Sequence, residues 1–272
     1  MVVIIGATGF IGMYTVERFL KEGTKVFATG RNPHTAAKLK EWGVTCIPLD
    51  ISKEEDFDRL PTEGVEAVIL LGGLLPANSK VDISKEENAE EYIQVNVIGT
   101  IHVLEYCRKN GIKKMITCSS YADVFGAWKK GVALKETEPR DYKFTGDHAV
   151  YVISKNAAND LVEYYNQQHG LRGAVFRLPP VYGVGPHGSI YVNGKLYKSG
   201  IQTFIEKARK GEPIEIWGDP HISRDIIYVK DVADAFVKAV KSEKTCGLYN
   251  MTSGTQLELE EQVKAVIEVF GD

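Results

Sequence analysis

A glycine-rich stretch near the amino terminus constrains the fold of this chain more than any other feature. In VVIIGATGFIGMYTVERFL, an apolar run precedes Gly6, Gly9 and Gly12, and a segment of helical periodicity follows them. Glycines at such a turn permit a tight bend and the close approach of a pyrophosphate, whose charge the free N–H groups at the helix N-terminus stabilise. The alternative is an ordinary glycine-rich turn without a ligand. However, the glycine-rich stretch lies at the first of several β/α alternations, which favours a dinucleotide site.

Short apolar runs alternate with segments of helical periodicity, which predicts βαβ units and a mostly parallel sheet. We expect strands at residues 2–5, 25–29, 44–49, 67–71, 114–118 and 173–178. We expect helices at residues 10–21, 35–42, 85–110, 148–169, 200–210, 229–241 and 257–270. The predicted fold class is α/β, a Rossmann-type doubly wound parallel sheet.

The alternation loosens from about Pro179 into PPVYGVGPHGSIYVNGKLYKSG, a segment rich in Gly and Tyr. Irregular segments of this kind carry ligand contacts more often than regular elements do. We therefore expect a dinucleotide-binding domain over residues 1–178. A small C-terminal substrate lobe, interleaved with late elements of the sheet, is expected over residues 179–272.

The composition bears on partners and compartment. The 33 Lys and Arg nearly balance the 36 Asp and Glu and no basic cluster stands out, so a nucleic-acid or anionic-membrane partner has no electrostatic support. Cys46, Cys107, Cys118 and Cys246 are too sparse for a disulfide framework, which favours a reducing cytoplasm. The opening MVVIIGATG has no basic region before it and is too short to span a bilayer, so export is not expected. Small molecules are the expected partners, and no metal site is predicted.

The residues after the second predicted strand bear on which dinucleotide binds. NAD binders often place an acidic residue there for the ribose 2′-hydroxyl, whereas KVFATGRNP offers Thr29, Gly30 and Arg31. A guanidinium can bind a 2′-phosphate bidentately, so Arg31 favours NADP over NAD. A solvated charge in the turn before Pro33 is the other interpretation. Asp50 could accept a hydrogen bond from the adenine amino group or cap the helix that follows.

The motif YVISK places Tyr151 and Lys155 four residues apart in a helical segment, so both side chains project from one face. An ammonium near a phenol stabilises the phenolate, which predicts a tyrosine pKa below its free value of about 10 and a usable general base or acid. The spacing is common by chance and gains weight only from the other motifs.

Together the motifs resemble the extended short-chain dehydrogenase/reductase family, the NAD-dependent epimerase/dehydratase group that mostly acts on nucleotide sugars. The resemblance covers nearly the whole chain, in the family's order: GATGFIG, Asp50, NVIGT with Asn96, SSYADVFG, YVISK, FRLPPVYGVGP and GDPHISRDIIYVKDVADAF. It implies a nucleotide-sugar epimerase, dehydratase or reductase with Tyr151 as catalytic base and Lys155 holding the nicotinamide ribose. It also implies that Asn96 supports the site and that Arg224 meets a substrate diphosphate, for which a bidentate donor is apt. A capping Asn96 and an ion pair between Arg224 and Asp225 are the alternatives.

The resemblance and the strand ends together give the expected contact residues. For the cofactor these are Gly6, Thr8, Gly9, Phe10, Ile11, Gly12, Arg31, Asp50, Ile51, Leu71, Gly72, Asn96, Ser119, Tyr151, Lys155, Pro179 and Val181. For the substrate they are Ser120, Tyr121, Pro180 and Arg224.

Two residues compete for the third catalytic hydroxyl. Relatives usually carry Ser or Thr three residues before the Val of a V-Y-G ending, and in this chain that position is Tyr121. The Tyr121 hydroxyl lies several ångströms farther from the backbone than that of a serine, so it could not bond the same oxygen without moving the substrate. Ser120 would serve if the loop were shifted by one residue. The sequence leaves both open, and reach favours Ser120.

Besides Tyr121, the chain departs from the family pattern in RLPPVYG, where many relatives have Asn and this chain has Pro180. This departure and the small lobe leave a reductase of a non-nucleotide carbonyl compound as an alternative. Tyr121 leaves a catalytically silent dinucleotide-binding regulator as another.

The long helices predicted at residues 85–110 and 148–169 bear on assembly. We expect their apolar residues Tyr92, Val95, Leu161 and Tyr165 to exceed what one sheet face can cover. In relatives the matching helices pair across a two-fold axis, so the resemblance implies a homodimer.

Overall fold

The computed structural model describes residues 1–129, 131–185 and 188–271. Its centre is a seven-stranded sheet in the order β12-β6-β5-β4-β1-β2-β3, with every neighbouring pair parallel. The strands are β1 (Val2–Ile5), β2 (Val26–Thr29), β3 (Thr45–Ile47), β4 (Ala67–Leu70), β5 (Lys114–Ser120), β6 (Arg172–Leu178) and β12 (Gly247–Asn250). The strand order reverses between β1 and β4, which confirms the predicted doubly wound, Rossmann-type sheet.

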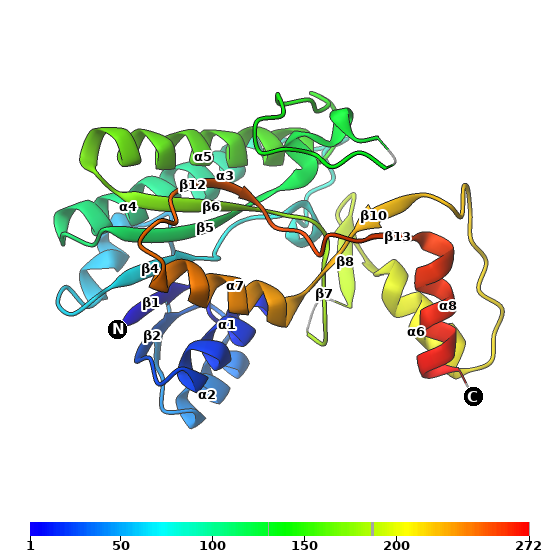
Figure 1. Cartoon of the computed structure of the whole chain (residues 1–272), viewed down its shortest axis with the longest axis horizontal. Coiled ribbons are helices and arrows are strands. Elements are labelled where there is room, and N and C mark those ends of the chain that lie inside the picture. The colour runs from blue at the N-terminus through cyan, green and yellow to red at the C-terminus, as the bar shows by residue number, and fades with distance from the viewer. Residues whose placement is uncertain (130, 186–187, 272) are drawn as a thin grey trace.

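Helices cover both faces of the sheet (Figure 1). On one face lie α1 (Phe10–Lys21), α2 (Pro33–Glu41) and α7 (Val229–Lys241), and on the other lie α4 (Gly99–Lys109) and α5 (Ala149–His169). Successive residues of β1 point to opposite faces, so Val2 and Ile4 belong to one core cluster while Val3 and Ile5 belong to the other.

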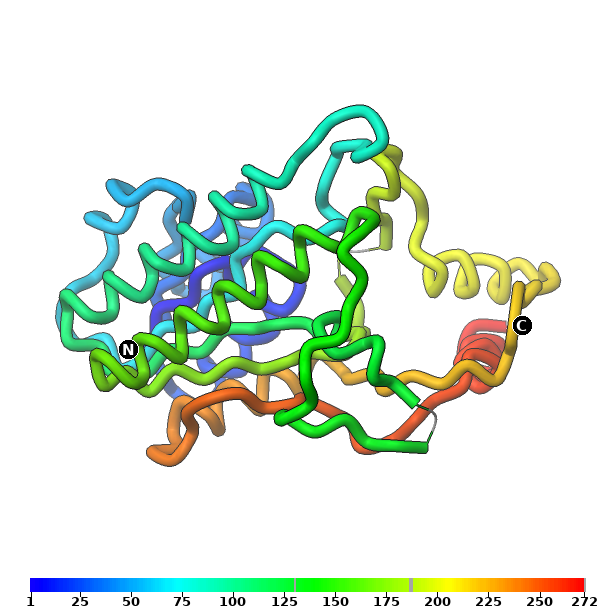
Figure 2. The backbone as a smooth tube through the Cα atoms, turned by 90° about the horizontal axis from the view of Figure 1, so that it is seen from above, coloured from blue at the N-terminus to red at the C-terminus, as the bar shows by residue number. Residues whose placement is uncertain are grey.

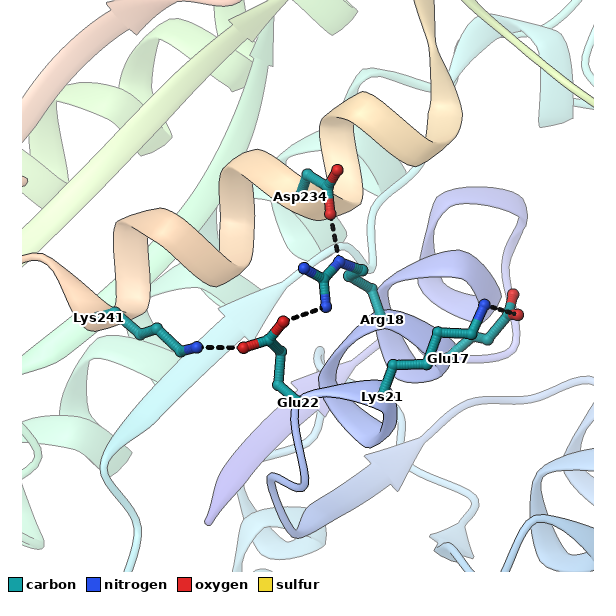
Figure 3. Close-up of polar contacts among 6 residues, drawn as sticks. All are labelled: Glu17, Arg18, Lys21, Glu22, Asp234 and Lys241. Atoms are coloured by element: carbon teal, nitrogen blue, oxygen red, sulfur yellow. Dashed lines mark hydrogen bonds and ion pairs between the residues drawn. The ribbon is translucent and has the colours of Figure 1, made fainter.

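Helices α1 and α7 lie side by side and are joined across their solvent side by charged residues (Figure 3). Arg18 contacts both Asp234 of α7 and Glu22, and Lys241 of α7 also contacts Glu22. Exposed pairs of this kind contribute little to stability individually. The buried Phe236, on the inner side of α7, shows that apolar packing holds this helix on the sheet.

The helix expected over residues 85–110 begins only at Ala89 and is built in three parts. After α3 (Ala89–Tyr92), the backbone takes π-helical geometry over Ile93–Ile98 (η3) before α4 continues. Single π turns in longer helices occur frequently at functional sites. The other predicted boundaries differ from the observed ones by only a few residues, as helix and strand ends commonly do.

The segment after β6 contains elements that the sequence pattern did not predict. Besides β12, these are β7 (Val181–Tyr182) paired with β11 (Ile227–Tyr228), the hairpin β8 (Ser189–Val192) with β9 (Lys195–Lys198), and β10 (Ser223–Asp225) paired with β13 (Gln256–Glu258). Two predicted helices, α6 (Gly200–Arg209) and α8 (Leu259–Phe270), pack together and stand apart from the sheet layers (Figures 1 and 2). Short 3-10 helices lie at η1 (Glu54–Arg59), η2 (Pro76–Asn78), η4 (Tyr121–Asp123) and η5 (Phe125–Ala127).

The apolar residues expected to be surplus on the long helices lie inside the protomer. Tyr92 and Tyr165 are buried, and Val95 and Leu161 pack against the core between the sheet and its helices. The expectation that these residues exceed what one sheet face can cover is therefore wrong for Tyr92 and Tyr165, which the protomer already covers, whereas Val95 and Leu161 are only partly buried. Among the residues that the structure describes, no helix is both long and apolar enough to cross a bilayer.

Candidate functional site

The turn between β1 and α1 is a cradle in which only glycine fits. Gly6 has a φ of +88°, and a Cβ placed on it would lie 2.5 Å from the backbone nitrogen of Gly72. A Cβ on Gly12 would lie 2.3 Å from the carbonyl oxygen of Gly6. The start of the turn thus approaches the loop after β4 on one side and the first residues of α1 on the other, with no room for side chains. The N–H groups and dipole at the start of α1 suit a pyrophosphate, so the observed residues fit a dinucleotide.

A cavity of about 750 Å³ runs from this cradle along the carboxyl ends of the sheet strands. Ligands of open α/β sheets bind at this edge. All the residues expected at the cofactor except Asn96 line it: Gly6, Thr8, Gly9, Phe10, Ile11, Gly12, Arg31, Asp50, Ile51, Leu71, Gly72, Ser119, Tyr151, Lys155, Pro179 and Val181. The expected substrate residues Ser120, Tyr121 and Pro180 also line it, whereas Arg224 does not.

Arg31 and Asp50 lie together at one end of the cavity. The Asp50 carboxylate accepts hydrogen bonds from the backbone N–H (3.0 Å) and hydroxyl (2.7 Å) of Ser52. Burial acts to raise the pKa of Asp50, but these hydrogen bonds and the charge of Arg31 outweigh it and hold the pKa below its usual range. Asp50 therefore caps a local turn while also facing the cavity.

Strand β5 ends at Ser120, which places its hydroxyl beside Tyr151. The Ser120 Oγ accepts a hydrogen bond from the backbone N–H of Ala122 (3.2 Å) and caps η4. Its side chain also lies close enough to that of Tyr151 to act on the pKa of the phenol. Tyr121 lines the same cavity but packs its ring edge-on against Phe125, with 5.7 Å between ring centroids. Of the two candidate hydroxyls, the one that meets Tyr151 is therefore that of Ser120.

The ionisation of Tyr151 and Lys155 differs from the sequence-based expectation. Burial raises the pKa of Tyr151 above its ordinary value, and the nearby Ser120 hydroxyl opposes this only in part. Burial also lowers the pKa of Lys155. The expectation that Lys155 holds the phenol pKa below 10 is wrong for this structure, because desolvation of both groups dominates.

Asn96 supports the site from behind the cavity wall. Its side-chain oxygen accepts a hydrogen bond from the Leu74 backbone N–H (2.8 Å), and its amide donates to the Leu74 carbonyl and to Ser154 Oγ, both at 3.0 Å. Asn96 thus joins the π-helical turn to the loop after β4 and to α5. It contacts the cavity only through those elements, and it does not cap a helix end.

Arg224 lies on β10 in the small lobe, with its side chain exposed. The neighbouring Asp225 accepts a hydrogen bond from the Ser253 backbone N–H (3.0 Å) and also contacts Thr252. Asp225 is therefore occupied in fixing the turn before β13, which the ion-pair interpretation did not predict.

Two further segments complete the cavity wall: the Gly- and Tyr-rich segment after Pro179, where ligand contacts were expected, and the loop after β4, which was not predicted to contribute. Ser189 and Ile190 of β8 line it, as do Leu74, Leu75, Ala77 and Asn78 from the loop after β4. The signal for the hairpin was present in IYVNGKLY, since Asn-Gly between alternating apolar residues favours a two-residue hairpin turn. Asn193 (φ +46°) and Gly194 (φ +70°) both have the positive φ values that such a turn requires.

Comparisons with known proteins agree with this geometry. The profile of the NAD dependent epimerase/dehydratase family matches residues 2–251. A putative UDP-glucose 4-epimerase of Methanocaldococcus jannaschii is 26% identical over 96% of this chain and 79% of its own. A dTDP-4-dehydro-6-deoxy-D-allose reductase of Streptomyces bikiniensis is 26% identical over 99% of this chain and 81% of its own. The crystal structure of Thermus thermophilus UDP-glucose 4-epimerase with NAD superposes with a TM-score of 0.78 at 28% identity, covering 98% of this chain and 82% of that one.

Proposed function

Because this chain belongs to the NAD-dependent epimerase/dehydratase family, we propose that it acts on a nucleotide sugar as an epimerase, dehydratase or reductase. One observation carries the proposal: Tyr151, Ser120 and Lys155 line a single cavity that begins at the glycine cradle. Its relatives, a putative UDP-glucose 4-epimerase and a dTDP-4-dehydro-6-deoxy-D-allose reductase, support this substrate class.

The three side chains have separate tasks in the proposed reaction. The bound nicotinamide dinucleotide would accept a hydride from the substrate carbon or return one to it. Tyr151 takes the proton from the substrate hydroxyl, or donates it to a carbonyl in the opposite direction. The Ser120 hydroxyl holds the reacting oxygen beside Tyr151, and Lys155 would hold the nicotinamide ribose. Because burial raises the pKa of Tyr151, oxidation of a hydroxyl should become faster as the pH rises above neutrality.

We propose NADP(H) as the preferred cofactor, with NAD(H) as the alternative. Arg31 lines the cavity at the end where Asp50 lies, and a guanidinium there suits a ribose 2′-phosphate. The structure of the Thermus relative holds NAD, and a cofactor that is regenerated in each turnover can take either form.

Incubation with UDP-, GDP- and dTDP-sugars and each nicotinamide dinucleotide tests the proposal. Nicotinamide absorbance and product sugar are measured together, so epimerisation, dehydration and net reduction are distinguished. Tyr151→Phe keeps the ring packing but removes the proton acceptor, so turnover should fall at least about 10²-fold while the cofactor still binds. A fully active Tyr151→Phe variant would contradict the assignment of Tyr151, and no turnover of any substrate by the wild type would favour a binding protein without catalysis.

A second candidate, a reductase of a non-nucleotide carbonyl compound, is favoured by the charges of the cavity. In residues 1–129, 131–185 and 188–271, the charged side chains that line it are Arg31, Asp50 and Lys155. Both cations are assigned to the cofactor in this proposal, so none of the described lining residues is left to meet a substrate diphosphate. NADP-linked reduction of simple ketones and aldehydes, with no reaction of any sugar nucleotide, would support this candidate.

We also propose that the protein is a homodimer that pairs through the outer faces of α4 and α5. On α5, Tyr164 is 53% exposed, and such an aromatic suits an interface. Sedimentation of a monomer at micromolar concentration would contradict this assembly.

A further inference from the structure

A buried ion pair lies directly behind the loop that carries Ser120. Asp123, the last residue of η4, faces Arg177 of β6. Arg177 Nε lies 3.0 Å from Asp123 Oδ1, and Nη2 donates to Oδ2 at 3.0 Å. The two side chains are only 4% and 5% exposed. The third nitrogen, Nη1, donates to the side-chain oxygen of Asn250 in β12 at 3.0 Å, so Arg177 joins the loop to two sheet strands.

The pair does not belong to the cofactor cavity. Asp123 and Arg177 line a separate polar cavity of about 320 Å³, together with polar residues of α5 such as Asn159. Neither residue lines the 750 Å³ cavity that contains Ser120 and Tyr151. Any effect of the pair on the reaction is therefore indirect, through the loop that carries Ser120 or through the end of β6, where Leu178 lines the larger cavity.

The loop gives a short path from the pair to the catalytic hydroxyl. Asp123 lies three residues after Ser120, and the single turn between them is capped by Ser120 Oγ. The carbonyl of Asp123 accepts a hydrogen bond from the backbone N–H of Asp141 (2.8 Å), whose carbonyl accepts one from Gly126 (2.8 Å). Fixing Asp123 therefore fixes the segment from Ser120 to Gly126.

A buried ion pair is weak evidence for a gain in stability. Burial raises the pKa of Asp123, and the attraction of Arg177 does not fully oppose it. Removal of the carboxylate from water therefore opposes the gain from pairing. Well-packed apolar residues in place of a buried pair are often neutral or stabilising.

We propose that Asp123 and Arg177 are positioning residues, which hold the β5–η4 loop so that the Ser120 hydroxyl stays within hydrogen-bonding distance of Tyr151. This proposal rests on the proposed function in one respect, namely that Ser120 and Tyr151 take part in turnover. The pair itself touches neither substrate nor cofactor.

The test replaces the pair by apolar residues, Asp123→Leu with Arg177→Met, in the whole chain. We expect the melting temperature to remain at or above that of the wild type, because the desolvation cost is removed. We expect kcat to fall by about 10- to 100-fold, since a displacement of about 1 Å at a reacting group has effects of this size. The KM of the cofactor should change by less than about two-fold, because the glycine cradle is not altered.

Hydrogen exchange gives a readout that needs no substrate. The amides of Ala122 and Val124, which bond Ser120 Oγ and the Tyr121 carbonyl, should exchange at least about 10-fold faster in the double variant, while those of β1 stay unchanged. The matched control is Arg18→Met with Asp234→Leu, a partly exposed Arg–Asp pair between α1 and α7 (Figure 3). It should change neither kcat nor exchange in the loop.

Each result decides the matter. Wild-type kcat and wild-type exchange in the double variant would overturn the proposal, and so would a fall in kcat that accompanies loss of the whole fold. The single variant Asp123→Asn leaves Arg177 with half of its partner and is expected to be the less stable of the two. If the wild type turns over no substrate, the proposed function fails, and the exchange of Ala122 and Val124 alone decides whether the pair positions the loop.

Discussion

The two ends of the large cavity are built by different means. At the cofactor end, the main chain at Gly6, Gly12 and Gly72 forms the surface, and all three lie beside the central strands β1 and β4. At the substrate end, side chains such as Leu75 and Ile190 form the surface, and they come from segments more than 100 residues apart. The cradle at the first end depends on backbone geometry, whereas the second end depends on how distant segments dock.

The hairpin shows how the substrate end is held. Its tip packs closely on the loop after β4. A Cβ added to Gly194 at this tip would lie only 2.8 Å from the Lys80 carbonyl oxygen of that loop. Lys80 Nζ also lies 6.0 Å from the centre of the Tyr191 ring, within reach of a cation–π contact. A change of a few residues in either segment would alter this wall without affecting the cradle. Such an arrangement allows one scaffold to take different substrates.

The largest effect is expected from a methyl group in the cradle. Gly6→Ala combines a strained positive φ with a clash against Gly72, so the free energy of unfolding should fall by about 2–5 kcal/mol and cofactor binding should be lost. Gly23→Ala is the matched control: its φ is +71° but nothing lies within 4 Å of the added Cβ, so only about 1–2 kcal/mol should be lost. Thermal unfolding and calorimetric titration with NAD(H) and NADP(H) measure both. Equal effects of the two substitutions would show that the cradle is not close-packed.

The next largest effect is expected on kcat, from removal of one of the two hydroxyls, those of Ser120 and Tyr121, at the boundary between the two ends. Ser120→Ala should lower kcat by a factor of about 10 to 10³, because the hydroxyl beside Tyr151 is lost. Tyr121→Phe removes only a hydroxyl from the cavity wall and should be nearly silent. Steady-state kinetics of both variants, with cofactor KM as a check, decide between them. A silent Ser120→Ala together with a slow Tyr121→Phe would reverse the assignment.

A smaller effect is expected at the far side of the cofactor end. Arg31→Ala should weaken NADP(H) binding by about one to two decades and leave NAD(H) nearly unchanged, because a charge-assisted contact contributes about 1.5–3 kcal/mol. Calorimetric titration of both dinucleotides gives the comparison. Equal losses for the two, or tighter binding of NAD(H) by the wild type, would rule out a 2′-phosphate contact at Arg31.

The two ends also differ in how well they could be predicted, because local sequence determines the cradle but not the docking of distant segments. The glycine triplet and the apolar runs predicted the cradle and six of the central strands, because both depend on residues close together in the chain. Strand β12, GLYN, was missed because four residues at the sheet edge carry almost no periodicity, and only pairing with β6 makes them a strand. The upward shift of the Tyr151 pKa was not predicted, for a related reason. Burial of that phenol sums contacts from elements far apart in the sequence, and no local spacing encodes this sum.

The smallest expected effect concerns the lobe beyond the substrate end, where His221 joins the loop before β10 to the start of α8. His221 Nδ1 lies 2.8 Å from Glu258 Oε2, and this contact, aided by Asp219 and Glu260, raises the pKa of His221. A histidine whose pKa is higher in the folded state stabilises that state fully below its unfolded pKa of about 6.5. The contribution is then lost as the pH rises through the higher, folded value.

We therefore expect wild type to melt above His221→Gln at about pH 5.5 to 6, by a small margin because the pair is exposed to solvent. The margin should vanish as the pH rises through the raised pKa of His221. His34→Gln, at an exposed histidine of α2 beside the cofactor end, is the control and should show no such trend. Melting curves of the three proteins at matched pH values test this. A margin that stays constant with pH would mean that His221 stabilises the lobe by packing rather than by charge, and the lobe would then resemble the cradle in being held by shape alone.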